Sequence, residues 1–155
     1  VNTLVVACYK LANDLRLLAS GPRSGIAELI LPSNEPGSSI MPGKVNPTQC
    51  EALSQVCMHL MGIHFSISFA CSQGHFQLNA NKTMILFSLN RIITLLSDSI
   101  DSFVKRCLEG LDLNRKKIRE NLENSLMLVT ALNPKIGYEK SSKIAKKAFS
   151  EGISL

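Results

Sequence analysis

The 155-residue sequence is poor in aromatic residues. Tryptophan is absent, and Phe, Trp and Tyr together make up 5% of the chain, whereas hydrophobic residues make up 45%. β-Sandwiches usually place aromatic and β-branched side chains on their strands, so a mainly aliphatic composition favours packed helices. No apolar run approaches the length needed to cross a bilayer, and we therefore do not expect a membrane protein.

The cysteines and histidines follow no metal-binding or disulfide pattern. The cysteines are odd in number, contain no CxxC pair and fall mostly within apolar helical patterns, which predicts buried thiols in a reducing compartment. They are Cys8, Cys50, Cys57, Cys71 and Cys107. His59, His64 and His75 lack the i,i+4 spacing of a helical metal site, so we expect core or surface histidines and no bound metal.

Positive charge is in excess, with a net charge of +5. Much of it lies in two groups, at residues 115–119 and 140–147. Neither interleaved aromatic residues nor a DNA-reading motif accompanies these groups, so solvated helix faces are the preferred interpretation and no nucleic-acid partner is expected. The surplus of positive charge would favour anionic metabolites.

Helical periodicity dominates the first two thirds of the chain. It predicts long helices over Thr3–Ser20, from Asn46 to about Cys71, and over about 25 residues around the stripe that ends at Cys107. The first stripe is Leu4, Cys8, Leu11, Leu15 and Leu18. The second is Leu53, Val56, Leu60, Ile63 or His64, and Ile67. The third is Ile85, Leu89, Ile92, Leu96, Ile100, Phe103 and Cys107.

The residues after about position 110 are more polar and predict a smaller helical unit. Shorter helical patterns cover 115–122, 125–132 and 138–150, with the breaker "NPKIG" before the last one. We assign residues 1–110 to part of a helical bundle domain and 111–155 to part of a small C-terminal domain. Because the first helical pattern has no initiator methionine or cap, and the apolar stripes need more partners than one chain offers, we expect a piece of a longer, associating protein.

The stretch Glu35–Glu51, "EPGSSIMPGKVNPTQCE", differs from the helices around it. Its three prolines restrict the backbone, while Gly37 and Gly43 permit turns and close approach of a ligand. Backbone N–H groups around residues 37–39 can form an anion-binding concavity, and Lys44 adds a cation just before a helix N-terminus. These features together suit a carboxylate clamp. The alternative is a rigid connector between two helices.

The end of this stretch also has the pattern of a helix start. Asn46 is a favourable N-cap, Pro47 suits the first helical position, and Gln49 occupies the place of a capping-box partner. The side-chain oxygen of Asn46 is then predicted to cap the helix, while its NH2 group donates to a ligand carboxylate.

The segment "GSSIMPGKVNP" closely resembles the signature of the fumarase/aspartase superfamily, helical homotetramers that break C–O or C–N bonds by β-elimination and release fumarate. "TQCEAL", "ANDLRLLASGPRSG" and "ENSLMLVTALNPKIGYEKSSKIAKKA" resemble class II fumarase, so the resemblance extends over the whole chain. It implies an all-α fold, a long-helix bundle with a small helical C-terminal domain. It also implies a fumarate hydratase that interconverts fumarate and (S)-malate without a metal or organic cofactor.

The resemblance also implies roles for single residues. Ser38 matches the catalytic base that removes the C3 proton of malate, and Glu51 matches the acidic partner of a catalytic histidine. The family's substrate-binding positions correspond to Ser39, Lys44, Val45 and Asn46. None of the three histidines lies in a context like that of the catalytic histidine, which we expect upstream together with the family's other substrate loops.

The isolated chain is therefore expected to be inactive. The implied partners are a small dicarboxylate and further subunits of a homotetramer, with no nucleic acid and no membrane. The implied setting is the tricarboxylic acid cycle, in the cytoplasm or in the mitochondrial matrix if the source is eukaryotic. Two alternatives stay open: an aspartate ammonia-lyase, and a helical assembly element without catalytic activity.

Overall fold

The structure, a computed structural model, describes residues 1–36 and 40–155. The chain divides into two compact units, Val1–Asp112 and Leu113–Leu155. Helices dominate both units, and the predicted all-α class is confirmed. The assignment of residues 1–110 and 111–155 to two domains of a larger enzyme stays a prediction.

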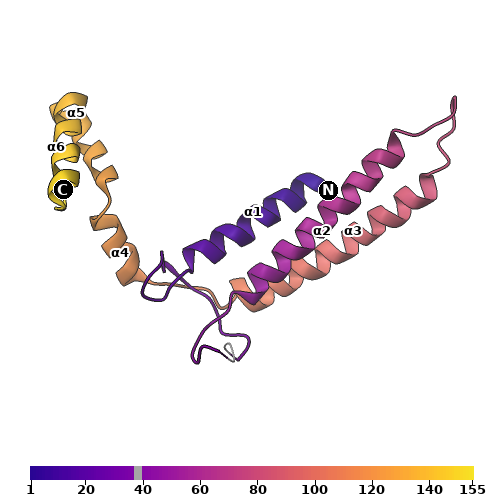
Figure 1. Cartoon of the computed structure of the whole chain (residues 1–155), viewed down its shortest axis with the longest axis horizontal. Coiled ribbons are helices and arrows are strands. Elements are labelled where there is room, and N and C mark those ends of the chain that lie inside the picture. Colours follow the sequence, from indigo (N-terminus) through magenta and orange to yellow (C-terminus); the bar gives the residue numbers. More distant parts are fainter. Residues whose placement is uncertain (37–39) are drawn as a thin grey trace. The chain divides into compact units, whose positions relative to one another are not determined.

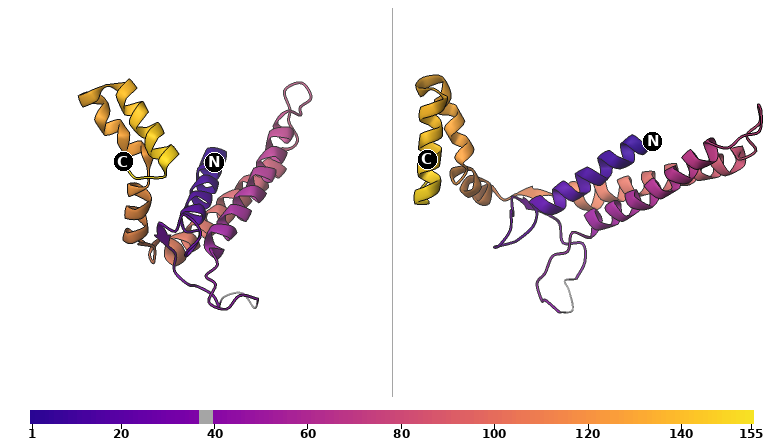
Figure 2. Two further views of the ribbon diagram at one scale, coloured as in Figure 1. Left: turned by 60° about the vertical axis from the view of Figure 1, so that its left-hand side comes forward. Right: turned by 45° about the horizontal axis from the view of Figure 1, so that its top comes forward.

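Three long helices build the first unit (Figure 1). They are α1 (Asn2–Leu18), α2 (Thr48–Cys71) and α3 (Lys82–Phe103), and a π-helical turn η1 (Val104–Leu108) continues α3. The helix α2 contacts both α1 and α3. In Figures 1 and 2, α2 and α3 run side by side in opposite directions and are joined at a tip formed by residues 72–81. The helices α1 and α2 begin and end within two residues of their predicted positions, and α3 with η1 spans the stripe predicted for the third helix.

The core of the first unit follows the stripes predicted for the second and third helices. Every residue of these two stripes is buried or half-buried, so both predictions are confirmed. The buried cluster draws its members from all three helices and from η1. It comprises Val5, Ala12, Cys50, Leu53, Cys57, Leu60, Ile67, Ile92, Leu96, Phe103 and Cys107.

The stripe predicted for the first helix is partly wrong. Cys8 and Leu15 pack against the core as expected, but Leu4 and Leu11 are 52% and 46% exposed. The contact seam of α1 passes through Val5 instead, and then through Ala12. Because α1 packs mainly against α2, only a narrow strip of its apolar surface is covered.

Apolar surface also remains open on the other two helices. Phe65 on α2 is 72% exposed, and Phe87 on α3 is 73% exposed. By length and composition, Thr48–Cys71 and Lys82–Leu108 are apolar enough to cross a membrane, with mean hydropathies of 1.2 and 1.3 over 18 residues. The expectation that no segment reaches this length is therefore wrong, because single polar residues interrupt the apolar runs without lowering their average much. Core helices of large bundles meet the same criterion.

A tight turn connects α1 to the chain that precedes α2. The carbonyl of Ser20 accepts a hydrogen bond from the backbone N–H of Ala27 at 2.7 Å. A Cβ atom at position 25 would lie 2.3 Å from that carbonyl oxygen, so the turn requires Gly25. The following residues are extended and include the strand β1 (Leu29–Ile30), which pairs with β2 (Asp112–Leu113) in the two-stranded sheet.

The second unit consists of short helices. They are α4 (Arg115–Glu123), the 3-10 helix η2 (Leu126–Leu132), α5 (Asn133–Ile136) and α6 (Tyr138–Glu151). Asn114 caps α4 by accepting a hydrogen bond from the backbone N–H of Lys117 at 3.2 Å. The "NPKIG" segment, predicted as a breaker, forms the one-turn helix α5 and ends at Gly137, whose φ is +83°.

The fully buried position of Leu60 leads to a stability prediction. Leu60→Ala removes side-chain volume from the seam between α1, α2 and α3, so it should lower the free energy of unfolding by about 2–5 kcal/mol in a urea titration. Gln55→Ala, at an exposed position of the same helix, is the matched control and should change it by less than about 0.5 kcal/mol. Equal effects of the two substitutions would contradict the packing described for α2.

Candidate active site

The loop between β1 and α2 is attached at its beginning to the end of the third helix. The side-chain amide of Asn34 donates a hydrogen bond to the backbone carbonyl of Arg106, in η1, at 2.7 Å. Nearby, Pro32 lies so close to Gly110 that an added Cβ there would be 3.0 Å from the proline ring. These two contacts hold the start of the loop against η1 and the residues that follow it.

The end of the same loop is attached to the same part of the structure. The Ser102 hydroxyl on α3 donates to the side-chain carbonyl of Gln49, in the first turn of α2, at 3.0 Å. One residue further along α2, the buried thiol of Cys50 is hydrogen-bonded to the thiol of Cys107 in η1. Both ends of the loop are therefore fixed to the carboxyl-terminal end of α3 and η1.

Within the loop, residues 41–44 form a β-turn that positions Lys44. The backbone N–H of Lys44 donates to the carbonyl of Met41 at 3.3 Å, with Pro42 and Gly43 at the two central positions. Gly43 has a φ of +77°, as the third residue of a type II turn requires. The predicted turn-forming role of Gly43 is confirmed. Lys44 and Val45 follow it with exposed side chains.

The predicted N-terminal cap of the second helix is wrong. The helix α2 begins at Thr48 after Pro47, and within the described residues no side chain caps its N-terminus. Asn46 stands one residue too early for a cap, and Gln49 binds Ser102 instead of closing a capping box. The half-buried amide of Asn46 is thereby left for another partner, which is compatible with its predicted role in binding a ligand.

The predicted catalytic base Ser38 and the predicted substrate-binding residue Ser39 lie outside the described residues. Their roles stay predictions that rest on the resemblance. The described neighbours of the loop also line a small hollow. It is bordered by Leu31, Pro32, Asn34, Asn46, Pro47, Thr48, Gln49, Cys50 and Cys107.

Thr48 is a residue of this hollow that the sequence analysis missed. Its hydroxyl oxygen is buried and, within the part of the chain that the structure describes, has no hydrogen-bond partner. A buried hydroxyl usually has one. Its position directly after the signature segment was the only signal that the sequence offered. A second, larger hollow between α2 and α3 is lined by Gln49, Ala52, Leu53, Leu95, Asp98, Ser99 and Ser102, and contains none of the predicted site residues.

Glu51 lies in the first turn of α2, where the helix dipole favours a carboxylate. Its Oε1 atom forms an ion pair with Nη2 of Arg16, near the end of α1, at 3.0 Å. The Arg16 and Glu51 side chains are 50% and 37% exposed. Sequence reasoning missed Arg16, although it lies within the quoted "ANDLRLL".

No histidine of this chain is placed to pair with Glu51. His59 and His64 follow it on α2 by eight and thirteen residues, which corresponds to about 12 and 20 Å along the helix axis. His75 lies in the tip between α2 and α3. The expectation that the histidine partner of Glu51 belongs to another segment stays a prediction. Among residues 1–36 and 40–155, no group of three or more His, Cys, Asp and Glu side chains could hold a metal ion.

Three of the five cysteines are buried thiols, as predicted, but Cys71 is exposed and Cys8 is half-buried. Burial, followed by the neighbouring thiol of Cys107, raises the pKa of Cys50 to about 12. Burial also raises the pKa of Cys57 to about 11, with a smaller contribution from Cys8. These two thiols stay protonated at neutral pH, which suits packing and not nucleophilic chemistry.

Two known protein families match the two ends of the chain. A family described as "Lyase" matches residues 1–62, and one described as "Fumarase C C-terminus" matches residues 128–155. Proteins named fumarate hydratase class II from Thermosynechococcus vestitus and Listeria monocytogenes are 56% and 58% identical over all 155 residues. These residues correspond to 33% and 34% of the two relatives, so the chain spans about a third of their length.

Solved structures agree in fold. A class II fumarase from Schistosoma mansoni is 50% identical with a TM-score of 0.94, over 99% of this chain and 32% of that one. A Brucella melitensis protein described as fumarate lyase:delta crystallin is 41% identical with a TM-score of 0.90, over 99% of this chain and 33% of that one. The fold of this chain is therefore similar to part of each of these two proteins. Over its whole length the chain is similar to class II fumarases.

The difference between buried and exposed thiols leads to a labelling prediction. Iodoacetamide at pH 7–8 should alkylate Cys71 first, while Cys50 and Cys57 should remain unmodified, as followed by peptide mass spectrometry. At about pH 9, where an ordinary thiol ionises, the alkylation of Cys50 and Cys57 should still be slow because their pKa values are higher. Cys71→Ser is the control that should abolish the fast reaction. Alkylation of Cys50 as fast as that of Cys71 would contradict the packing described.

Proposed function

We propose that this chain is part of a fumarate hydratase, a lyase that interconverts (S)-malate and fumarate by elimination and addition of water. The observation that carries the proposal is the signature "GSSIMPGKVNP", which leads directly into α2 and lies between Asn34 and Gln49, the two residues that bind η1 and α3. Relatives of this chain carry the same activity in their names, which supports the proposal.

Substrate binding is assigned to the end of the loop. The ammonium group of Lys44 attracts a carboxylate, and the amide of Asn46, which does not cap α2, donates a hydrogen bond to it. Val45 contributes through its backbone, and Ser39 through its hydroxyl. Negative charge on that carboxylate grows as the carbanion-like aci-carboxylate forms. Contacts from Lys44 and Asn46 are therefore stronger in the transition state than in the ground state, which accelerates the reaction.

Ser38 is assigned as the base. As an alkoxide it takes the proton from C3 of malate, the C2–O bond then breaks, and the hydroxyl leaves as water after receiving a proton from an acid of the assembled site. A serine hydroxyl is a poor base in water, so the oxyanion needs nearby N–H donors and positive charge. The glycines of the loop and Lys44 are the groups of this chain that can supply them.

Glu51 is assigned as the partner of a catalytic histidine that another segment contributes. The complete site then requires association, and the exposed apolar surfaces of α1, α2 and α3 support the proposal that further helices cover them in a homotetramer. We place this enzyme in the cytoplasm, or in the mitochondrial matrix if the source is eukaryotic. A role in the tricarboxylic acid cycle is part of the same proposal.

The catalytic assignment of Ser38 is tested in the longest natural protein that carries this chain. Ser38→Ala should lower kcat for malate dehydration by about a hundredfold or more, because the proton at C3 then has no base, while assembly stays intact. The rate is followed by the absorbance of fumarate, and assembly by light scattering. Ser33→Ala, at an exposed serine outside the signature, is the matched control and should keep the normal rate. A near-normal rate for Ser38→Ala would remove Ser38 from the role of base.

A substrate comparison with the same protein separates the proposed activity from its alternatives. Malate should give fumarate and aspartate should not. Release of ammonia from aspartate would identify an aspartate ammonia-lyase, and inactivity with both substrates would leave only an assembly role. The purified 155-residue chain should be inactive, because the segment with the catalytic histidine is missing from it.

A further inference from the structure

We propose that Arg16 is a positioning residue that holds Glu51 in its working orientation. The inference deepens the proposed function, on which it rests. Its structural basis is the ion pair between Nη2 of Arg16 and Oε1 of Glu51 at 3.0 Å. This pair joins the last turns of α1 to the first turn of α2, directly beside the end of the signature loop.

The connection across two helices distinguishes this ion pair from others in the chain. Among the residues that the structure describes, five further pairs each join residues three or four positions apart on one helical segment, where they support that segment alone. They are Lys10–Asp14, Asp101–Lys105, Lys117–Glu120, Arg119–Glu123 and Lys147–Glu151. The pair of Arg16 and Glu51 instead fixes the direction of a side chain on α2 relative to α1.

The geometry of the ion pair suits a role in orienting Glu51 more than a role in stabilising the fold. Both side chains are partly exposed, and an exposed ion pair contributes little to folding because water and salt screen it. Arg16 is permanently charged, and its Nη2 atom pairs with Oε1 of Glu51. Among the described residues, the ion pair with Arg16 is the contact that the structure gives for the Glu51 side chain. A histidine contributed by another segment would meet a carboxylate already held by Arg16.

The neighbourhood of the pair also indicates where it acts. Arg16 and Glu51 are the charged groups that influence the buried thiol of Cys50, whose other neighbour Cys107 belongs to η1. The ion pair is thus part of the same cluster that fixes the end of the loop carrying Lys44 and Asn46. A change in the direction of Glu51 alters the site without displacing the residues that bind substrate.

The experiment compares Arg16→Gln with unsubstituted protein, in the longest natural protein that carries this chain. We expect kcat for malate dehydration to fall about tenfold to a hundredfold, because a misplaced catalytic group costs rate. KM should change less than about twofold, since Lys44 and Asn46 are untouched. Arg16→Lys should recover most of the activity, because a single contact to Oε1 needs a cation and not a bidentate fork.

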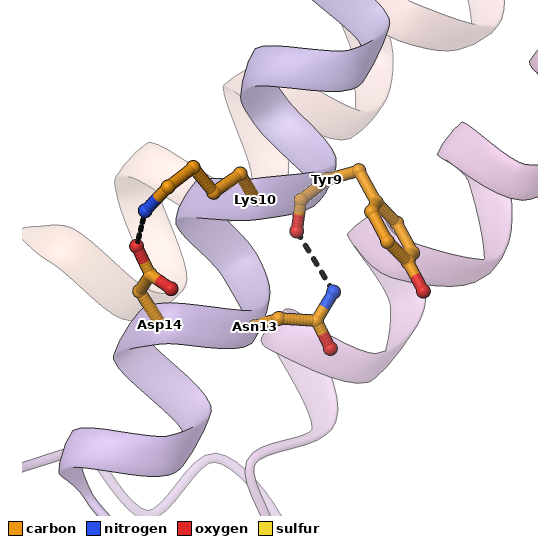
Figure 3. A network of polar contacts seen from close by, with 4 residues as sticks. All are labelled: Tyr9, Lys10, Asn13 and Asp14. Atoms are coloured by element: carbon orange, nitrogen blue, oxygen red, sulfur yellow. Dashed lines mark hydrogen bonds and ion pairs between the residues drawn. The ribbon is translucent and has the colours of Figure 1, made fainter.

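Coupling and control variants complete the test. In protein that already carries Glu51→Gln, adding Arg16→Gln should lower kcat no further, since the residue that Arg16 positions is gone. Lys10→Gln removes another exposed cation of α1, one that pairs with Asp14 inside the same helix (Figure 3), and should leave kcat unchanged. Thermal unfolding and light scattering are measured for every variant.

Several results would overturn the inference. They are normal kcat in Arg16→Gln, an equal loss in Lys10→Gln, full additivity with Glu51→Gln, and loss of activity that follows unfolding or dissociation of the assembly. If the unsubstituted protein itself does not dehydrate malate, the proposed function fails and this inference fails with it. An active protein whose Arg16 variant is also fully active refutes the inference alone.

Discussion

The attachment of the loop before α2 to the end of α3 and η1 is the constraint on which the site depends. Asn34 binds the carbonyl of Arg106 at one end, and Gln49 binds Ser102 at the other. The π-helical turn η1 follows α3 and carries Cys107, which meets Cys50 in the core. Extra residues in a helical turn often occur near functional sites. Here the turn supplies a backbone acceptor for Asn34 in the loop and a buried contact for Cys50 on α2. Contacts between residues about 50–70 positions apart in the sequence therefore hold both ends of the loop.

The narrow core leaves much of the apolar surface of the first unit exposed. Only one strip of each helix is buried, and large side chains such as Phe65 and Phe87 stay exposed on the remaining faces. Large exposed apolar side chains on several helices are typical of surfaces that contact other helices or a membrane. The proposal that further helices cover the first unit in a homotetramer rests on these exposed faces.

Sequence reasoning succeeded where the physical rule is periodic. The stripes of α2 and α3 are correct because both helices are buried along one continuous seam. For α1 the same rule selected Leu4 and Leu11, which are exposed. Several faces of this helix are apolar, and the sequence does not show which of them packs against a neighbour in this unit. The cap at Asn46 failed for a local reason. Gln49 and Cys50 are held by α3 and η1, so contacts distant in the sequence fix where α2 begins. Arg16 was missed because an ion pair between two helices leaves no spacing rule in the sequence.

Positive charge is unevenly distributed between the two units, which bears on the proposed attraction of an anionic substrate. The first unit carries eight basic and eight acidic side chains, whereas the second carries nine and four, so the whole excess of +5 belongs to residues 113–155. The unit that contains the signature loop is therefore electrically balanced. Screening limits the reach of exposed charges to about 8–10 Å in physiological salt. The dicarboxylate binding proposed at this loop would then depend on local groups: the exposed ammonium of Lys44, backbone N–H groups and the N-terminus of α2. With Glu51 neutralised by Arg16, its negative charge opposes that binding less than a free carboxylate would.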